Sequence, residues 1–251
     1  MAFGPSFIIF MIMKLVAIGD IHGRDIWKQI VETEQPNTVV FVGDYFDSFD
    51  IPGKTQIDNF KNIIQWKHDN PQCKVVMLIG NHDFHYMPEA YNDRYSGFQR
   101  DLYIEIGQTL EANKHHLKMA YKCDDLVFSH AGITPEFLLS NNWGDQDIVE
   151  FINDLWHYRP HKFKFANNGH DYSDPYGDNT FQTPLWIRPK SLMEACQDVK
   201  KTMIQVVGHT AVKQIDAKGK ATGGRYYFID CLDHTPEYLV YENKQIKINK
   251  I

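Results

Sequence analysis

Cysteine is scarce in this chain of 251 residues, which contains four. Cys73, Cys123, Cys196 and Cys231 lie far apart, and none of them forms a CxxC pair. Disulfide frameworks and structural zinc sites need closely spaced or regularly spaced cysteines, so we expect neither in this protein. This cysteine usage fits a reducing cytoplasm best.

The chain also lacks an excess of basic residues. Its formal net charge at pH 7 is −6, and the charges are spread along the sequence rather than gathered in blocks. A dedicated nucleic-acid-binding protein would normally present a basic face. We therefore expect no stable nucleic-acid partner, although bound divalent cations would make a cleft locally positive. No repeat, linker or low-complexity tract divides the chain, and its length suits one large domain.

Long apolar runs are absent as well. The segment Phe7–Met13 is apolar but too short to span a bilayer. No cationic segment precedes it and no small-residue cleavage site follows it, as a signal peptide would require. We expect a short N-terminal extension over residues 1–13, with a natural start at Met13, ahead of a single domain over residues 14–251. Mass spectrometry that finds Met1 retained in the native protein would contradict this start. We expect no membrane association.

The first third of the chain alternates short apolar runs with helical stretches. Lys14–Ile18, Thr38–Val42 and Lys74–Ile79 are apolar runs that each end at a glycine, a pattern typical of buried strands. Residues 25–34 and 55–70 are predicted to be helical. The order strand, helix, strand, helix, strand predicts a parallel sheet built from βαβ units.

The rest of the chain is less regular. We predict helices over residues 97–114 and 145–157, and a long surface loop over Arg159–Thr183, which is rich in Asn, Gly, Asp, Tyr and Pro. The remaining predicted strands, in chain order, cover residues 118–122, 126–129, 204–207, 226–229, 238–241 and 245–248. We expect the last three of these strands to form an antiparallel meander.

Five short polar motifs follow the predicted strands in a fixed order. They are GDIHG (Gly19–Gly23), GDYFD (Gly43–Asp47), GNHD (Gly80–Asp83), SHAGI (Ser129–Ile133) and GHT (Gly208–Thr210). Strand ends are where an α/β sheet exposes side chains to a ligand. Five such ends that supply Asp, His and Asn are what a two-metal hydrolytic centre needs.

Each motif offers a particular chemistry. The spacing of Asp20 and His22 lets both side chains reach one ion, and a carboxylate with a neutral imidazole suits Mn²⁺, Fe²⁺, Zn²⁺ or Ni²⁺. Asp44, directly after its strand, is a natural carboxylate to bridge two ions. Asn81 offers a neutral oxygen ligand. His82 beside it could be a general acid that protonates a leaving alkoxide.

The remaining candidates depend more on context. Asp47 is placed to hydrogen-bond a general acid at His82, which would fix the tautomer of that imidazole and raise its pKa. His130 and His209 each follow a predicted strand. Taken alone, each of these residues has an ordinary explanation, such as a turn-capping aspartate or a core histidine. The order and context of the five motifs together favour a functional metal site.

With these motifs the chain resembles the calcineurin-like metallophosphoesterases, from about Lys14 to its C-terminus. It most resembles the phosphoprotein phosphatase branch, which includes bacterial and phage serine/threonine phosphatases and symmetrical diadenosine tetraphosphatases. The resemblance implies an α/β fold, a four-layer α-β-β-α sandwich in which two packed mixed β-sheets are flanked by helices. It also implies a metal-dependent phosphatase in which two divalent cations share a hydroxide that attacks phosphorus in line.

The resemblance further implies a role for each site residue. Asp20, His22 and Asp44 would hold the first ion, and Asp44, Asn81, His130 and His209 would hold the second. His82 would be the general acid and Asp47 its partner. We expect two Mn²⁺ ions, with Fe, Zn or Ni as alternatives.

One position departs from the family pattern. The second motif of the family usually reads GDxxDR, with an arginine that clamps phosphate, and here Ser48 stands at that position. A serine hydroxyl can donate one hydrogen bond but supplies no charge and no bidentate fork. We expect Ser48, Asn81 and Arg188, which lies in the stretch PLWIRP, to contact the substrate. Arg24 is a weaker candidate for a phosphate-binding arginine.

Ser48 keeps other functions open. Phosphodiesterases of the same superfamily often lack this arginine, but they usually end in GHxH, and here Ala211 stands where the second histidine would be. The SHAGI motif is also closer to the phosphatase pattern. We therefore favour a phosphomonoesterase of the serine/threonine phosphatase type over a phosphodiesterase or a diadenosine tetraphosphate hydrolase. The presence of every inferred ligand and of His82 disfavours a metal-binding module without catalysis.

Three substrate classes fit these motifs: a phosphorylated protein, a small phosphoester and a dinucleoside polyphosphate. Aromatic side chains in or beside the loop Arg159–Thr183 could stack on a nucleobase, although ordinary packing is the simpler explanation for them. These side chains are Trp156, Tyr158, Tyr172, Tyr176 and Trp186.

Overall fold

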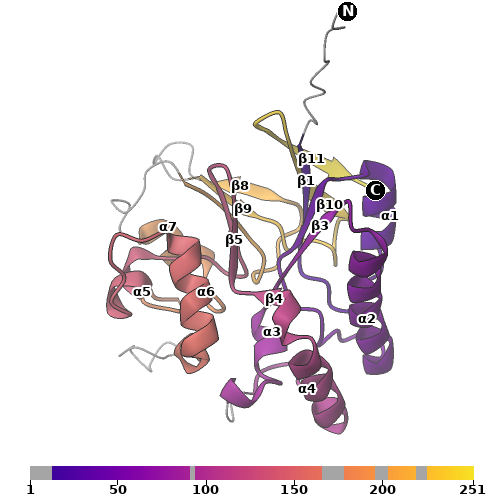
Figure 1. Ribbon diagram of the computed structural model, residues 1–251, viewed down its shortest axis with the longest axis horizontal. Helices are drawn as coiled ribbons and strands as arrows, with labels where there is room; N and C mark the ends of the chain where they lie inside the picture. The colour runs from indigo at the N-terminus through magenta and orange to yellow at the C-terminus, as the bar shows by residue number, and fades with distance from the viewer. Residues whose placement is uncertain (1–12, 91–93, 166–177, 196–202, 219–224) are drawn as a thin grey trace, which may run out of the picture.

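Two β-sheets form the centre of the protein (Figure 1). The computed structural model describes residues 13–90, 94–165, 178–195, 203–218 and 225–251. The first sheet has six strands in the order β11-β10-β1-β2-β3-β4. These strands are β1 (Lys14–Ile18), β2 (Thr38–Phe41), β3 (Lys74–Leu78), β4 (Leu117–Lys118), β10 (Glu237–Glu242) and β11 (Gln245–Lys250).

The first three strands are parallel and are joined by two helices. Helix α1 (Trp27–Glu34) connects β1 to β2, and helix α2 (Gly53–Asp69) connects β2 to β3. The strand register places Leu15 beside Thr38 and Thr38 beside Lys74. Parallel neighbours run in the same direction, so each connection must cross back over the sheet, and a helix is the usual way to do so.

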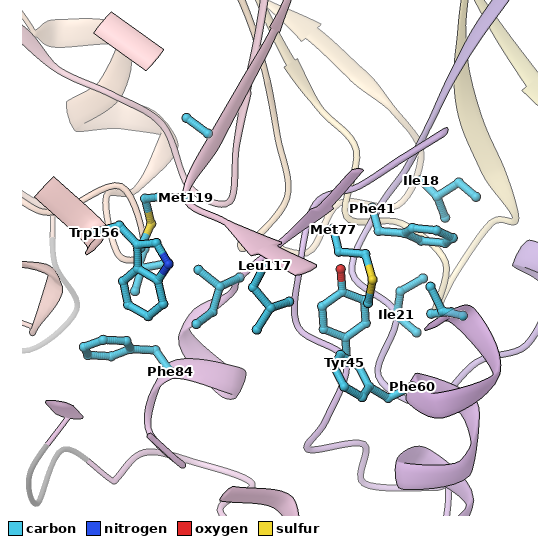
Figure 2. Close-up of a cluster of buried hydrophobic side chains, with 14 of the residues drawn as sticks. Ile18, Ile21, Phe41, Tyr45, Phe60, Met77, Phe84, Leu117, Met119 and Trp156 are labelled. Atoms are coloured by element: carbon cyan, nitrogen blue, oxygen red, sulfur yellow. The ribbon is translucent and has the colours of Figure 1, made fainter. Parts of the chain in front are cut away.

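Alternation of side chains along β1 divides the core into two layers. Val16 and Ile18 pack in the same cluster as Trp27 and other side chains of the helical layer, and Figure 2 shows Ile18 in that layer. Leu15 and Ala17 point the other way, into a cluster shared with the second sheet. Successive strand residues face opposite sides, so a strand covered on both faces reads as a continuous apolar run.

The second sheet has five strands in the order β5-β6-β7-β9-β8. They are β5 (Ala120–Cys123), β6 (Leu126–Ser129), β7 (Ile204–Val207), β8 (Asp216–Lys218) and β9 (Arg225–Phe228). The other α-helices are α3 (Asn81–Phe84), α4 (Tyr103–Ala112), α5 (Pro135–Ser140), α6 (Ile148–Tyr158) and α7 (Pro189–Glu194). Short 3₁₀ turns are η1 (Pro88–Ala90), η2 (Arg100–Leu102), η3 (Lys114–His116) and η4 (Pro160–Phe163).

Helices cover the outer side of each sheet. Helices α1 and α2 lie beside the first sheet, and α5, α6 and α7 gather beside the second (Figure 1). Leu192 of α7 packs with Val207 and Phe228 of the second sheet. Both sheets contain parallel and antiparallel pairs. The predicted fold class, two mixed sheets flanked by helices, is therefore confirmed.

The predicted antiparallel meander at the C-terminal end is wrong. Strand β9 lies in the second sheet and runs parallel to β7, with Ile204 beside Arg225. Strands β10 and β11 instead form a hairpin in the first sheet, where β10 runs antiparallel to β1. Local patterning predicts strands, but it carries no information on which distant strand each one pairs with.

Other boundaries also need correction. The strand predicted over residues 118–122 is divided between β4 and β5, which belong to different sheets. At this transition Asn153 of α6 accepts hydrogen bonds from the backbone N–H groups of Met119 and Ala120, at 3.0 and 3.2 Å. The helix predicted over residues 97–114 is limited to η2 and α4. Helices α3, α5 and α7 and strand β8 were not predicted, although Thr134 and Pro135 form a capping signal for α5.

Parts of two predictions fall outside the described residues. These are the N-terminal extension, except Met13, and residues 166–177 of the predicted surface loop. Within the described ranges, no helix has the length and apolar character that crossing a membrane requires.

Candidate metal centre

Three residues at the ends of β1 and β2 form a compact cluster. One ligand atom each of Asp20, His22 and Asp44 lies within 4.8 Å of the other two. His22 Nδ1 is 2.6 Å from the carbonyl oxygen of Phe46. A carbonyl only accepts hydrogen bonds, so Nδ1 carries the proton and Nε2 presents its lone pair toward the cluster. Two carboxylates and one imidazole lone pair could hold a divalent cation here.

A second group of ligands lies on the other side of Asp44. Asn81 Oδ1 is 2.8 Å from His130 Nε2 and 2.9 Å from His209 Nδ1. His130 Nε2 is 3.4 Å from Asp44 Oδ2, and the same Asp44 oxygen is 3.9 Å from His22 Nε2. A single carboxylate oxygen therefore stands between the two groups.

The orientation of both histidines in the second group suits a cation. His130 Nδ1 lies 2.9 Å from the carbonyl oxygen of Val42, and His209 Nε2 lies 3.2 Å from that of Trp186. Each of these nitrogens must donate its proton to the carbonyl. When the rings are neutral, the remaining lone pairs point at the side-chain oxygen of Asn81. A shared cation would turn these facing lone pairs into ligands, and such carbonyl contacts are typical of metal-bound histidines.

The backbone around the cluster adopts an unfavourable conformation at four polar residues. His22, Asp44, Asp47 and His209 have φ values of 41°, 50°, 68° and 66°. This left-handed region costs a non-glycine residue on the order of 1 kcal/mol, and such strain concentrates at functional sites. All four residues belong to the motifs that follow the strands.

Two positions in the motifs require glycine, because carboxylate oxygens of the cluster lie too close for a side chain. A Cβ atom on Gly80 would lie 2.0 Å from Asp44 Oδ1, and one on Gly208 would lie 1.9 Å from Asp20 Oδ1. Any side chain at either position would displace a carboxylate of the cluster.

The charges of the cluster are unbalanced in a way that a cation would correct. Asp20 is 1% exposed, and its Oδ1 has no hydrogen-bond partner among the residues that the structure describes. Burial, together with the nearby carboxylates of Asp230 and Asp44, raises the pKa of Asp20 well above its usual range. Burial would also raise the pKa of Asp44, but His130 and His82 outweigh it and hold that pKa well below its usual range. Buried carboxylates with an orphaned oxygen fit bound divalent cations.

His82 and Asp47 lie together beside the metal cluster. His82 Nδ1 donates to Asp47 Oδ2 at 2.9 Å, and the backbone N–H of His82 donates to Asp44 Oδ1 at 2.9 Å. Burial alone would lower the pKa of His82, but the carboxylates of Asp44 and Asp47 outweigh it and raise the pKa to about 9. The Nε2 atom of a ring held in this way is left to carry a proton toward a substrate.

Asp47 is surrounded by further donors that sequence reasoning did not identify. Tyr86 Oη and Gln99 Nε2 both donate to Asp47 Oδ1. His85 Nε2 lies 2.6 Å from Asp47 Oδ2, and both side chains are fully buried. The ligand atoms of Asp47, His82 and His85 also lie within 4.8 Å of one another, but both oxygens of the carboxylate already accept hydrogen bonds.

Asp230 is another buried carboxylate that the sequence analysis left out. It is 8% exposed and lies two residues after the end of β9, close enough to Asp20 to raise its pKa. The rule applied to the other motifs, that polar residues just after a strand face the site, would have found it. No comparable sequence pattern identifies His85 as a site residue.

A pocket opens beside His22, Asp47 and His82. Its other lining residues are Arg24, Ser48, Phe49, Asp50 and Asp233. Ser48 Oγ lies 2.5 Å from Asp50 Oδ1 and also accepts from the backbone N–H of Ile51 at 3.2 Å. The predicted substrate contact of Ser48 therefore competes with hydrogen bonds inside its own turn.

Arg188 lies near His209. Its Nη1 donates to Thr210 Oγ1 at 3.1 Å, and its charge adds to burial in lowering the pKa of His209. It does not line the pocket of Arg24 and Ser48.

The tryptophans near the predicted loop are packing residues. Trp156 and Trp186 are 5% and 6% exposed. Trp156 packs against Phe84 and Phe163, and Trp186 against Tyr95 and Phe165. Tyr158 is largely exposed, and Tyr172 and Tyr176 lie outside the described residues.

The fold and the paired ligand groups define a metal-dependent phosphoesterase. Residues 13–213 match the family model of the calcineurin-like phosphoesterases. The chain belongs to this family of phosphoesterases, whose members depend on two metal ions. No curated protein matches the chain significantly in sequence.

Solved phosphatases share the fold at low sequence identity. A mutant of a cold-active protein tyrosine phosphatase matches with a TM-score of 0.64 and 17% identity, over 95% of this chain and 78% of that one. The cold-active protein-tyrosine phosphatase of a psychrophilic Shewanella species matches with a TM-score of 0.59 and 18% identity, over 95% and 78%. A protein serine/threonine phosphatase from Saccharomyces cerevisiae matches with a TM-score of 0.55 and 14% identity, over 95% and 80%.

Proposed function

We propose that this protein is a phosphomonoesterase of the serine/threonine protein phosphatase type that acts with two divalent metal ions. The observation that carries the proposal is the position of Asp44 Oδ2, 3.9 Å from His22 Nε2 and 3.4 Å from His130 Nε2. One carboxylate oxygen between two sets of imidazole lone pairs is the arrangement that a bridging ligand needs.

The proposed ligands divide between the two ions as the family resemblance implies. Asp20, His22 and Asp44 would hold one ion, and Asp44, Asn81, His130 and His209 would hold the other. Bound divalent cations supply a nucleophile by lowering the pKa of a coordinated water, and they neutralise charge on the phosphoryl oxygens. Carboxylate, amide and imidazole donors together suit Mn²⁺, so we take Mn²⁺ as the ion for the assays, with Fe, Zn or Ni as alternatives.

The protein's own part in the reaction is proton transfer and orientation. His82 donates the proton on Nε2 to the leaving alkoxide, while its Nδ1–H stays hydrogen-bonded to Asp47. Asp47 fixes the ring and stabilises its protonated form. Arg188, beside His209, contributes positive charge on the side of the second ion.

The first experiment compares hydrolysis of p-nitrophenyl phosphate, bis-p-nitrophenyl phosphate and diadenosine tetraphosphate, with Mn²⁺ present. We expect turnover of the monoester and little of the diester. Activity on the diester alone would instead assign the protein to the phosphodiesterases, and preferred turnover of the tetraphosphate would assign it to the dinucleotide hydrolases. Metal binding without hydrolysis of any substrate would leave only a metal-binding module. Phosphorylated protein as the natural substrate and a cytoplasmic location are parts of the same proposal.

A further inference from the structure

Arg24 is the only arginine among the described residues that line the pocket beside His82. It follows the loop that carries Asp20 and His22. Its Nη2 forms an ion pair with Asp233 and lies 3.5 Å from Asp50 Oδ1. The side chain is 17% exposed, so a fixed cation lies at the mouth of the candidate site.

The guanidinium of Arg24 and the side chain of Ser48 meet at the same atom. Ser48 Oγ lies 2.5 Å from Asp50 Oδ1, the oxygen that Arg24 Nη2 also approaches. Arg24 therefore reaches the part of the pocket where the family pattern places an arginine at position 48. Ser48 itself supplies no charge there.

A side-chain amide and two backbone carbonyls contact Arg24. Its own carbonyl oxygen accepts a hydrogen bond from Asn59 Nδ2 at 2.9 Å, and its Nη1 lies 3.5 Å from the carbonyl oxygens of Ile21 and His22. Among the described residues, its Nε–H has no hydrogen-bond acceptor. A guanidinium held in this way loses little entropy when it binds an anion and still has N–H groups to donate.

We propose that Arg24 binds the phosphoryl group of the substrate in place of the arginine that is missing at position 48. This inference rests on the proposed function, because it requires a phosphoester in this pocket. Asp50 and Asp233 flank the single positive charge of Arg24 with two negative charges. The mouth of the pocket therefore suits one phosphoryl group and disfavours the extended negative charge of a polyphosphate chain.

The test measures phosphate binding as well as turnover. In the metal-loaded protein, Arg24→Gln should raise the inhibition constant of inorganic phosphate and the KM for p-nitrophenyl phosphate by about 10-fold or more, because charge-assisted hydrogen bonds are lost. Arg24→Lys should give a smaller rise. Lys28→Gln, which removes an exposed positive charge from the neighbouring helix α1, is the matched control and should change neither constant.

A rescue experiment separates phosphate binding from a structural role. If Arg24 replaces the missing arginine, Ser48→Arg combined with Arg24→Gln should recover most of the lost phosphate affinity. Unchanged phosphate affinity in Arg24→Gln would overturn the inference. So would a loss of bound metal in parallel with phosphate affinity, because Arg24 would then act by supporting the loop of His22.

The proposed function and this inference can fail separately. A wild-type protein that hydrolyses no phosphomonoester would contradict the proposed function. Calorimetric titration of inorganic phosphate into the same metal-loaded protein would still show whether Arg24→Gln weakens binding. Should Arg24→Gln prove unfolded by circular dichroism, Arg24→Lys and Ser48→Arg in the wild-type background provide the comparison. Phosphate affinity unaffected by either of these variants would then overturn the inference.

Discussion

Asp44 and Asp47 are two buried carboxylates on one loop, and their surroundings differ in kind. When His22 and His130 are neutral, each donates its Nδ1–H to a backbone carbonyl and turns the lone pair of Nε2 toward Asp44 Oδ2. Asp47 faces N–H and O–H donors, including His82 and Tyr86. One carboxylate is prepared for a metal ion and the other for a protonated imidazole. The comparison teaches that the orientation of neighbouring protons, more than burial, distinguishes a metal ligand from a partner in acid catalysis.

The largest expected effect comes from removing the charge of Asp44. Asp44→Asn should release bound metal and lower turnover of p-nitrophenyl phosphate by at least about 10²-fold, because a main charge-stabilising element of the site is lost. Metal content by mass spectrometry and kcat measure the two effects. Asp25→Asn, at an exposed aspartate near α1, is the control. Full metal content in Asp44→Asn would contradict the bridging position of Asp44.

Removing His82, the partner of Asp47, should affect proton transfer but not metal binding. His82→Ala should keep its metal and lose about 10²- to 10⁴-fold in turnover of an alkyl phosphate, whose leaving group needs a proton. The loss for p-nitrophenyl phosphate should be much smaller, because its leaving group departs unprotonated. His157→Ala, on α6, is the matched control. Equal losses on the two substrates would rule out a general-acid role for His82.

A milder change sharpens the contrast between the two carboxylates. Tyr86→Phe removes one donor to Asp47 Oδ1 and leaves Gln99 as the remaining donor to that oxygen. The variant should lose about 1–3 kcal/mol in free energy of unfolding, because a hydrogen bond to a charged carboxylate is lost and the backbone N–H of Gln99 loses its acceptor. It should also lose less turnover than His82→Ala. Denaturant titration of the metal-free protein measures stability, and the exposed Tyr158→Phe is the control.

Glu34 extends the comparison to a carboxylate far from the metal centre. It pairs with Lys14 and accepts hydrogen bonds from Tyr238 Oη at 2.8 Å and Asn249 Nδ2 at 2.7 Å. Burial alone would raise the pKa of Glu34, but these partners outweigh it and lower the pKa below its ordinary value of 4.5. Its contribution to stability is therefore fully present above that value and is lost as the pH falls through the lower, folded-state pKa.

The smallest expected effect is thus a pH-dependent loss of folding stability in Glu34→Gln. At neutral pH the variant should be less stable than the wild type by about 1 kcal/mol. Denaturant titrations at decreasing pH should show this difference shrink below pH 4.5. Glu32→Gln, on the same helix but exposed, should show no comparable change. A stability difference between wild type and variant that stays constant with pH would mean that the charge of Glu34 does not contribute to stability.

Local sequence patterns predicted the elements that carry the first ligands. The bounds of β1, β6 and β7 agree with the predicted runs, because each is a short apolar segment ended by a polar or glycine residue. The rule that side chains just after a strand gather at one edge of the sheet also agrees with the cluster of Asp20 and Asp44, to which Asn81 is linked through His130. These are properties that neighbouring residues determine.

Other features depend on contacts that no local pattern contains. The placement of β9 in the second sheet depends on pairing with β7. The contact of His85 with Asp47 depends on the packing of α3 against the loop after β2. Each of these was missed because its cause is tertiary rather than sequential.

The position of β1 between β2 and β10 has a consequence for synthesis of the protein. Lys14 lies beside Glu242, and the backbone N–H of His209 donates to Asp20 across 189 positions of sequence. Contacts between such distant segments form late, because a long loop must close first. While the ribosome is still adding the second half of the chain, Asp20 and Asp44 lack the histidines that complete the centre. On the proposed ligand assignment, we infer that a nascent chain cannot hold both metal ions before His209, which follows β7, has left the ribosome.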